Sequence, residues 1–191
     1  LPISASAIVQ HHHQRYDGSG FPVVKGTNPE KGLSGSDIHI FARIVAAADL
    51  FDRLRNPADT VNAKPESHRQ MPVVRVLRLM RRGPYNKWVD PVVLMALLAV
   101  VPPYPPGSIV TLSNGQRAVV ADWHPDNPCR PTVVTLMTDA GIINPEAEGG
   151  TKIDLRKELA LEIAEIDGVE VLQQSHESEC CGFGGDRKSV V

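Results

Sequence analysis

A proline-rich segment near the middle of the sequence limits what this chain can fold into more than any other feature. The run Pro102-Pro103-Tyr104-Pro105-Pro106-Gly107 cannot continue a helix and is expected to be a stiff linker. Apolar residues recur at helical spacing before this run and form short β-rich runs after it. We therefore expect a mainly α part over residues 1–101 and a small antiparallel β extension over residues 104–165.

The longest helical pattern in the first part extends from Asp37 to Arg55. Its predicted apolar side carries Ile40, Ile44, Ala47, Ala48, Phe51 and Leu54. The following stretch, Asn56 to Met71, is interrupted by prolines and is predicted to be a loop. Asp90 followed by Pro91 is typical of a helix start and predicts a further helix that ends near Val101.

A short helix with two different faces is predicted between the loop and Asp90. The apolar face carries Val73, Val76, Leu77 and Met80. The opposite face carries Arg75, Arg78 and Arg82. A stripe of this kind is usually solvated, so we assign it no ligand.

The part after the linker contains a strong hairpin signal. Ile109 to Leu112 and Ala118 to Val120 are apolar runs, and the turn Ser113-Asn114-Gly115 lies between them. Thr132 to Met137 is a third β-rich run, and Ile142-Ile143 is a short fourth one. Residues 166–191 are interpreted as a separate tail.

The composition is that of a soluble globular protein. The 191 residues are 42% hydrophobic and 22% charged with a formal net charge of −2, which excludes collagen-like, coiled-coil and fully disordered chains. Near-neutral charge provides no general field for a nucleic acid polymer or a membrane. The longest apolar run, Val92 to Val101, is too short to span a bilayer. Three cysteines, two of them adjacent and the third far away, are not expected to form a disulfide framework, which fits a cytoplasmic location.

The first fifty residues carry a pattern suited to metal chemistry. The segment His11-His12-His13 offers imidazole ligands for Fe, Mn or Zn, which need a carboxylate to complete a charged site. Asp17 begins a tight glycine-containing turn. Asp49 borders the apolar face of the predicted helix, where a carboxylate needs a cation or a hydrogen-bond partner.

Simpler interpretations of these residues stay open. The histidines could be the remnant of an expression tag or a solvated cluster at a helix end. Asp49 could cap its helix or form an ordinary ion pair with Arg43 or Arg53.

The combined pattern resembles the C-terminal half of an HD-GYP domain. The matching segments are His12-His13, Arg15-Tyr16-Asp17-Gly18-Ser19-Gly20-Phe21-Pro22, and Ala42-Arg43-Ile44-Val45-Ala46-Ala47-Ala48-Asp49-Leu50-Phe51-Asp52. These bacterial signalling enzymes are metal-dependent phosphodiesterases that hydrolyse cyclic di-GMP and related cyclic dinucleotides. The resemblance implies a partial HD-type helical bundle, and the β extension also resembles a segment that follows this domain in some members.

The resemblance implies a role for six residues, and Arg53 is added to them as a candidate substitute for a missing basic residue. His12, His13 and Asp49 match metal ligands of the family, which holds two or three iron or manganese ions. Asp17, Gly18, Gly20 and Arg53 are expected to contact substrate or to shape the mouth of the pocket. The loop Gly20-Phe21-Pro22 is a candidate docking surface for a signalling protein. The family's remaining ligands precede these motifs, so we expect the chain to be a fragment that binds metal weakly and is inactive alone.

Departures from the family pattern leave a second function open. Gln14 replaces a Glu, Phe21 replaces the signature Tyr, and the segment Arg55 to Lys64 lacks the family's phosphate-binding basic residues. Arg53, Arg55 or Lys64 are the candidate substitutes. The chain could therefore be a binding or docking module without turnover.

The tail carries a different motif. Cys180-Cys181-Gly182-Phe183-Gly184-Gly185 is similar to the CCG motif of iron–sulfur oxidoreductases, which makes a redox subunit a further alternative. A four-thiolate site needs more cysteines, and residues 1–128 contain none. We expect the pair to be metal-free and the last residues, Asp186 to Val191, to be an adapter-derived end.

Overall fold

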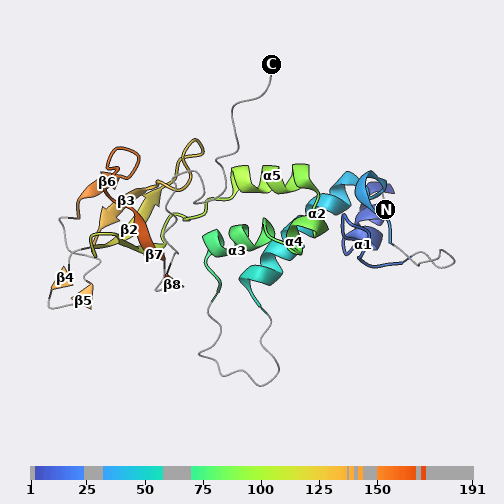
Figure 1. The fold of residues 1–191 in the computed structure, drawn as a ribbon, viewed down its shortest axis with the longest axis horizontal. Helices are drawn as coiled ribbons and strands as arrows, with labels where there is room; N and C mark the ends of the chain where they lie inside the picture. Colours follow the sequence, from blue (N-terminus) through green and yellow to red (C-terminus); the bar gives the residue numbers. More distant parts are fainter. Residues whose placement is uncertain are drawn as a thin grey trace, which may run out of the picture. The chain divides into compact units, whose positions relative to one another are not determined.

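The computed structural model describes residues 3–23, 32–57, 70–136, 138–139, 142–143, 150–166 and 169–170. All its helices precede residue 101 and all its strands follow residue 108 (Figure 1). The predicted order of helices followed by an antiparallel sheet is confirmed, but the fold is mixed rather than mainly α. The chain separates into two compact units, one of residues 1–71 and 76–100, the other of residues 72–75 and 101–191.

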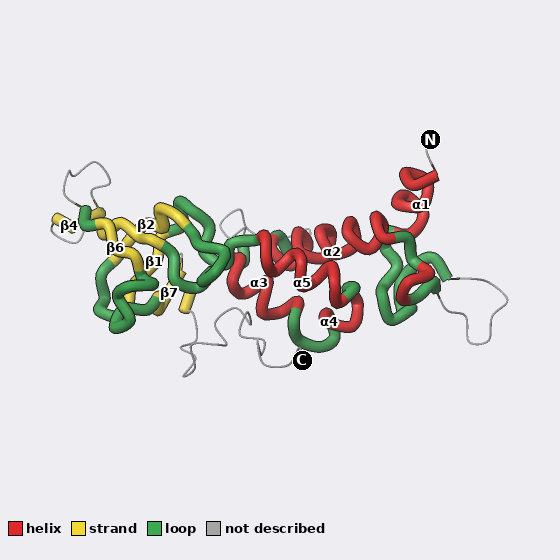
Figure 2. The backbone as a smooth tube through the Cα atoms, turned by 90° about the horizontal axis from the view of Figure 1, so that it is seen from above, coloured by secondary structure: helices red, strands yellow, loops and turns green. Residues whose placement is uncertain are grey.

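The helices of the described chain are short except for one (Figure 2). They are α1 (Ile3–His11), the 3₁₀ helix η1 (Gly35–Asp37), α2 (Ile40–Arg55), α3 (Val73–Met80), α4 (Tyr85–Trp88) and α5 (Pro91–Val100). No helix among the described residues has the length and apolar character needed to cross a membrane.

Helix α2 begins later than predicted and buries a different side of its surface. Its first turn follows His39, whose Nδ1 accepts a hydrogen bond from the Phe41 backbone N–H at 3.2 Å. The buried side is formed by Ala42, Ala47 and Leu50, whereas Ile40 and Ile44 are exposed. The first ten residues of α2 are apolar on nearly every side, so periodicity alone could not identify the packed face.

The predictions for α3 and α5 are confirmed. Val73, Val76, Leu77 and Met80 are all buried on α3. Asp90 caps α5, because its Oδ1 accepts a hydrogen bond from Val92 N at 2.7 Å. The Asp90 side chain also forms an ion pair with Arg43 of α2, and this ties the two helices together.

The second unit is built on a six-stranded antiparallel sheet in the order β6-β3-β2-β1-β7-β8. Its strands are β1 (Ile109–Leu112), β2 (Arg117–Asp122), β3 (Thr132–Thr135), β6 (Lys152–Asp154), β7 (Ile163–Ile166) and β8 (Val169–Glu170). A separate pair consists of β4 (Thr138–Asp139) and β5 (Ile142–Ile143). The predicted hairpin is confirmed, with Val110 opposite Ala118 and Gly115 at φ +83° in the turn.

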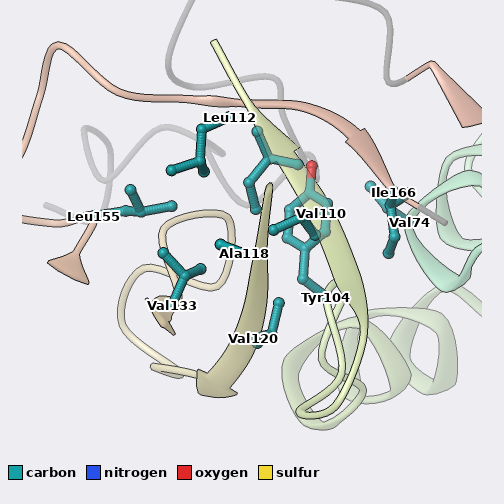
Figure 3. Close-up of a cluster of buried hydrophobic side chains, with 10 residues drawn as sticks. Val74, Tyr104, Val110, Leu112, Ala118, Val120, Val133, Leu155 and Ile166 are labelled. Carbon is teal, nitrogen blue, oxygen red and sulfur yellow. The ribbon is translucent and has the colours of Figure 1, made fainter. Parts of the chain in front are cut away.

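Two features of the sheet differ from the sequence prediction. Strand β7 pairs with β1, and β8 pairs with β7, so the sheet continues beyond the expected boundary at residue 165. Tyr104, predicted to lie in a linker, is only 1% exposed. Its ring belongs to the apolar core of the second unit together with Val110, Leu112 and Val120 (Figure 3).

The loop between β2 and β3 carries His124 and Cys129. Cys129 is partly buried and packs against the apolar core of the second unit. His124, which lies near it in sequence, has its Nε2 at 3.0 Å from Thr132 Oγ1. Cys180 and Cys181 lie outside the described residues, as does most of the predicted loop between Asn56 and Met71.

Candidate functional site

The end of α1 presents the paired histidines. His12 Nδ1 lies 3.0 Å from the carbonyl oxygen of Ile8 and 3.1 Å from that of Val9. A carbonyl can only accept, so Nδ1 carries the proton and the lone pair of Nε2 is left for another partner. A backbone carbonyl behind a ring nitrogen is the arrangement that orients histidine ligands in metal sites. The rings of His12 and His13 lie with their centroids 4.0 Å apart.

Asp49 of α2 lies beside this histidine pair. Its Oδ2 is 3.9 Å from His13 Nδ1 and 2.7 Å from a terminal nitrogen of Arg53. The Oδ2 atom is shielded from solvent, and the Arg53 N–H is not aligned for a hydrogen bond, so this contact is an ion pair only. Of the two ion pairs that the sequence left open, Asp49 forms the one with Arg53.

The glycine-containing turn folds back on the histidines. Asp17 Oδ1 accepts hydrogen bonds from the backbone N–H of Ser19 at 2.9 Å and from its hydroxyl at 2.7 Å. Gly18 has φ +81°, which favours glycine. A Cβ on Gly20 would lie 2.5 Å from the carbonyl oxygen of His13, so only glycine fits there. The turn thereby holds the backbone of His13 in place.

Gln14 holds the exit of the same turn. Its side chain is buried at 3% exposure, and Nε2 donates a hydrogen bond to the carbonyl oxygen of Pro22. The neutral amide can make this contact, whereas the Glu typical of the family has no N–H to donate. The Nε2 group of Gln14 thus has a partner, whereas its Oε1 atom is buried without a hydrogen bond among the described residues.

A cavity of about 330 Å³ adjoins the histidines. Of the predicted site residues, His12, His13, Gly20 and Arg53 line it, and Asp17, Gly18 and Asp49 do not. Its other lining residues are Gln14, Arg15, Ser19, Phe21, Val23, Ala46, Leu50, Trp88 and Val89. The structure thus brings part of the predicted site to one cavity.

Sequence reasoning gave no role to Arg15 or Trp88, which both line this cavity. The Arg15 guanidinium lies 3.6 Å from the centroid of the Trp88 ring, a cation–π contact. Tyr16 N also donates to the carbonyl oxygen of Trp88 at 2.9 Å, which anchors α4 to the turn. Arg15 could have been suspected from its position inside the motif, but no local signal connects Trp88 to it.

The spacing of the His13 and Asp49 donor atoms fits a single shared cation, but a third ligand is not in place among the described residues. Two ligand atoms bound to the same ion at about 2.1 Å lie roughly 3 to 4 Å apart, close to the spacing of His13 Nδ1 and Asp49 Oδ2. Within the part of the chain that the structure describes, no three His, Cys, Asp or Glu side chains come together as a metal site. His13 Nδ1 and Asp49 Oδ2 are therefore spaced like two ligands of one ion, and the ring of His12 lies beside that of His13.

Comparison with known proteins defines the class of the first unit. Residues 4–91 match the family model described as an HD domain, and residues 109–175 match the one described as a KOW domain associated with HD domain. Residues 4–91 therefore form a domain of the HD superfamily, whose members generally bind divalent metal ions.

Similarity to curated relatives makes the assignment within the HD superfamily more specific. A cyclic di-GMP phosphodiesterase of Pseudomonas aeruginosa is 30% identical over 60% of this chain, and a probable one of Vibrio cholerae is 35% identical over 49%. A cyclic di-GMP phosphodiesterase response regulator of Xanthomonas campestris is 51% identical over 25% of the chain. The domain belongs to the HD-GYP type. The chain spans only 23%, 18% and 10% of the lengths of these relatives.

Proposed function

We propose that this chain is part of a metal-dependent phosphodiesterase that hydrolyses cyclic di-GMP or a related cyclic dinucleotide. The observation that carries the proposal is the placement of Asp49 Oδ2 3.9 Å from His13 Nδ1, beside the cavity that His13 lines. A solvent-shielded carboxylate oxygen with an imidazole beside it is a donor pair for a divalent cation. The relatives' names indicate the substrate class.

The residues of the chain have distinct roles in this proposal. His13 and Asp49 hold a metal, of which the complete domain would contain two or three, as Fe or Mn. Such a metal, when bound, supplies the charge that makes water nucleophilic at neutral pH and screens the phosphate oxygens. His12 adds a donor whose tautomer is set by the Ile8 carbonyl oxygen. The turn from Asp17 to Gly20 fixes the backbone of His13 and shapes the edge of the cavity.

A docking module without turnover is the second candidate. Phe21 is 68% exposed at the tip of the turn, which supports the Gly20-Phe21-Pro22 loop as a surface for a signalling partner. Arg55, one candidate phosphate ligand, donates instead to Gln70 Oε1 at 3.1 Å. Lys64 lies outside the described residues. The described cavity thus has no basic residue from the segment Arg55 to Lys64 among its lining.

Hydrolysis by the complete protein that contains this chain tests the proposal. Replacing His13 or Asp49 by Ala should lower cyclic di-GMP turnover by several orders of magnitude with manganese or ferrous iron supplied, because the nucleophile depends on the metal. Arg75→Ala is the control, since Arg75 is exposed on α3 and does not line the cavity, and it should retain turnover.

Two other results would contradict parts of the proposal. Turnover by Asp49→Ala at the parent's rate would contradict the ligand assignment. A complete protein that binds cyclic di-GMP but does not hydrolyse it with either metal would favour the docking module.

A further inference from the structure

We propose that Arg53 and a divalent cation exchange at Asp49, so that cation binding releases the Arg53 guanidinium to bind a phosphate group in the cavity. This inference rests on the proposed function, because it requires His13 and Asp49 to hold a cation. It adds a role for Arg53 that couples two binding events at the same site.

The first step is that Arg53 occupies the place where a cation would bind. Asp49 Oδ2 is shielded from solvent, and the Arg53 guanidinium lies 2.7 Å from it. A carboxylate oxygen removed from water needs a positive partner, and the guanidinium supplies that charge. A divalent ion on the same oxygen, within reach of His13 Nδ1 at 3.9 Å, would supply it instead.

The second step is that both cations cannot remain close together. An ion bound at about 2.1 Å from Asp49 Oδ2 would lie within about 5 Å of the guanidinium, where charges of the same sign repel. The Arg53 side chain is 63% exposed and is one helical turn from Asp49, so it can move away without disturbing the core. Because the Arg53 end of the pair is exposed to water, its contact with Asp49 is weaker than a fully buried ion pair.

The third step is the destination of the released guanidinium. Arg53 already lines the cavity that His12 and His13 line, so leaving Asp49 does not remove it from the site. A guanidinium presents a planar pair of N–H donors that matches phosphate oxygens. The released Arg53 is therefore placed to bind a phosphate group of a nucleotide.

The exchange has a thermodynamic consequence. If cation binding frees Arg53 for phosphate, then each ligand must strengthen the binding of the other by the same factor. A chain without the Arg53 guanidinium should bind the cation more tightly on its own and should lose this mutual strengthening.

The test measures Mn²⁺ affinity of the 191-residue chain by electron paramagnetic resonance, with and without inorganic phosphate. Arg53→Gln removes the competitor. Arg55→Gln is the matched control, because it removes the same charge from the same helix while Arg55 contacts Gln70 rather than Asp49. Asp49→Asn tests whether the bound Mn²⁺ uses this carboxylate, and circular dichroism verifies that each variant is folded.

Without phosphate, Arg53→Gln should bind Mn²⁺ about two- to five-fold more tightly than the parent, the range expected for removing an exposed ion pair. Arg55→Gln should change the affinity by much less. Phosphate should tighten Mn²⁺ binding in the parent and in Arg55→Gln, and this effect should disappear in Arg53→Gln.

The outcomes separate this inference from the proposed function. Equal changes in Arg53→Gln and Arg55→Gln would show a long-range charge effect and would overturn the exchange, as would phosphate tightening that persists in Arg53→Gln. In both cases the metal site would stand if Asp49→Asn weakens Mn²⁺ binding. If Asp49→Asn leaves Mn²⁺ binding unchanged, the metal site itself is wrong and the exchange falls with it.

Discussion

Hydrogen-bond partners set the charge and proton positions of individual side chains in both units. In the first unit the Ile8 carbonyl oxygen selects the tautomer of His12. In the second unit Arg156 Nε donates to Asp154 Oδ1 at 3.0 Å and its terminal nitrogen donates to Oδ2 at 2.9 Å. This paired hydrogen bond from Arg156 is the main reason that the pKa of Asp154 is lowered from 3.8 to about 2.

The Asp154 carboxylate should therefore titrate unusually low. Because its pKa in the folded chain is lower than in the unfolded chain, its contribution to stability is present above about pH 4 and is lost as the pH falls through about 2. Arg156→Gln should raise the pKa of Asp154 back toward 3.8. Nuclear magnetic resonance of the Asp154 carboxyl carbon against pH measures this directly, and an unchanged midpoint in Arg156→Gln would contradict the assignment.

Helices in the first unit are connected by a buried ion pair. The Asp90 side chain is only 2% exposed, and it pairs with Arg43 of α2 while capping α5 through Val92 N and Val93 N. A carboxylate in this position is stable only with its partners present. The pair therefore places α5 on α2, on which Asp49 and Arg53 also lie.

Removing the cation of this pair should destabilise the helical unit. Arg43→Ala leaves the Asp90 carboxylate buried with its capping hydrogen bonds alone, at a cost of about 3 kcal/mol in the free energy of unfolding. Urea denaturation followed by far-ultraviolet circular dichroism provides the measurement. Arg75→Ala, at an exposed position of α3, should change this free energy by less than about 0.5 kcal/mol. A similar small effect for Arg43→Ala would show that the pair does not support the unit.

At the scale of the whole molecule, the sheet unit has an apolar core of its own. Tyr104 is its largest fully buried side chain, and Val110, Leu112, Val120 and Leu155 belong to the same cluster. The cluster draws on residues from both ends of the unit, since Ile166 of β7 is also a member. A unit with its own core can be perturbed without changing the core of the other unit.

Replacing Tyr104 should therefore affect one unit selectively. Tyr104→Ala should lower the stability of the sheet by about 3 to 5 kcal/mol, as for other buried aromatic side chains. Amide hydrogen exchange should become faster in β1 and β2 while α5 retains its protection. Tyr104→Phe keeps the ring and should cost much less. Equal loss of protection in α5 would show that the units unfold together.

Local sequence patterns determined much of this structure. The four-residue apolar stripe of α3, the Asp90-Pro91 helix start and the Asn114-Gly115 hairpin could each be predicted, because the backbone conformation depends on neighbours within a few positions. The motif around His12 and His13, together with Asp49, was enough to indicate the family. In these cases the interactions that determine the backbone conformation lie within one turn of helix or one hairpin.

Only the tertiary structure decided which distant groups meet. Apolar residues surround the start of α2, so the side that packs depends on its neighbours in space. Likewise, β7 lies beside β1 with Val110 opposite Ile166, and Trp88 lies under Arg15. Such pairs require a chain loop to close, and the free energy comes from complementary surfaces that no short window of sequence contains. That is why candidate ligands could be named from the sequence, while the cavity beside them and the choice of Arg53 over Arg43 as the partner of Asp49 required the fold.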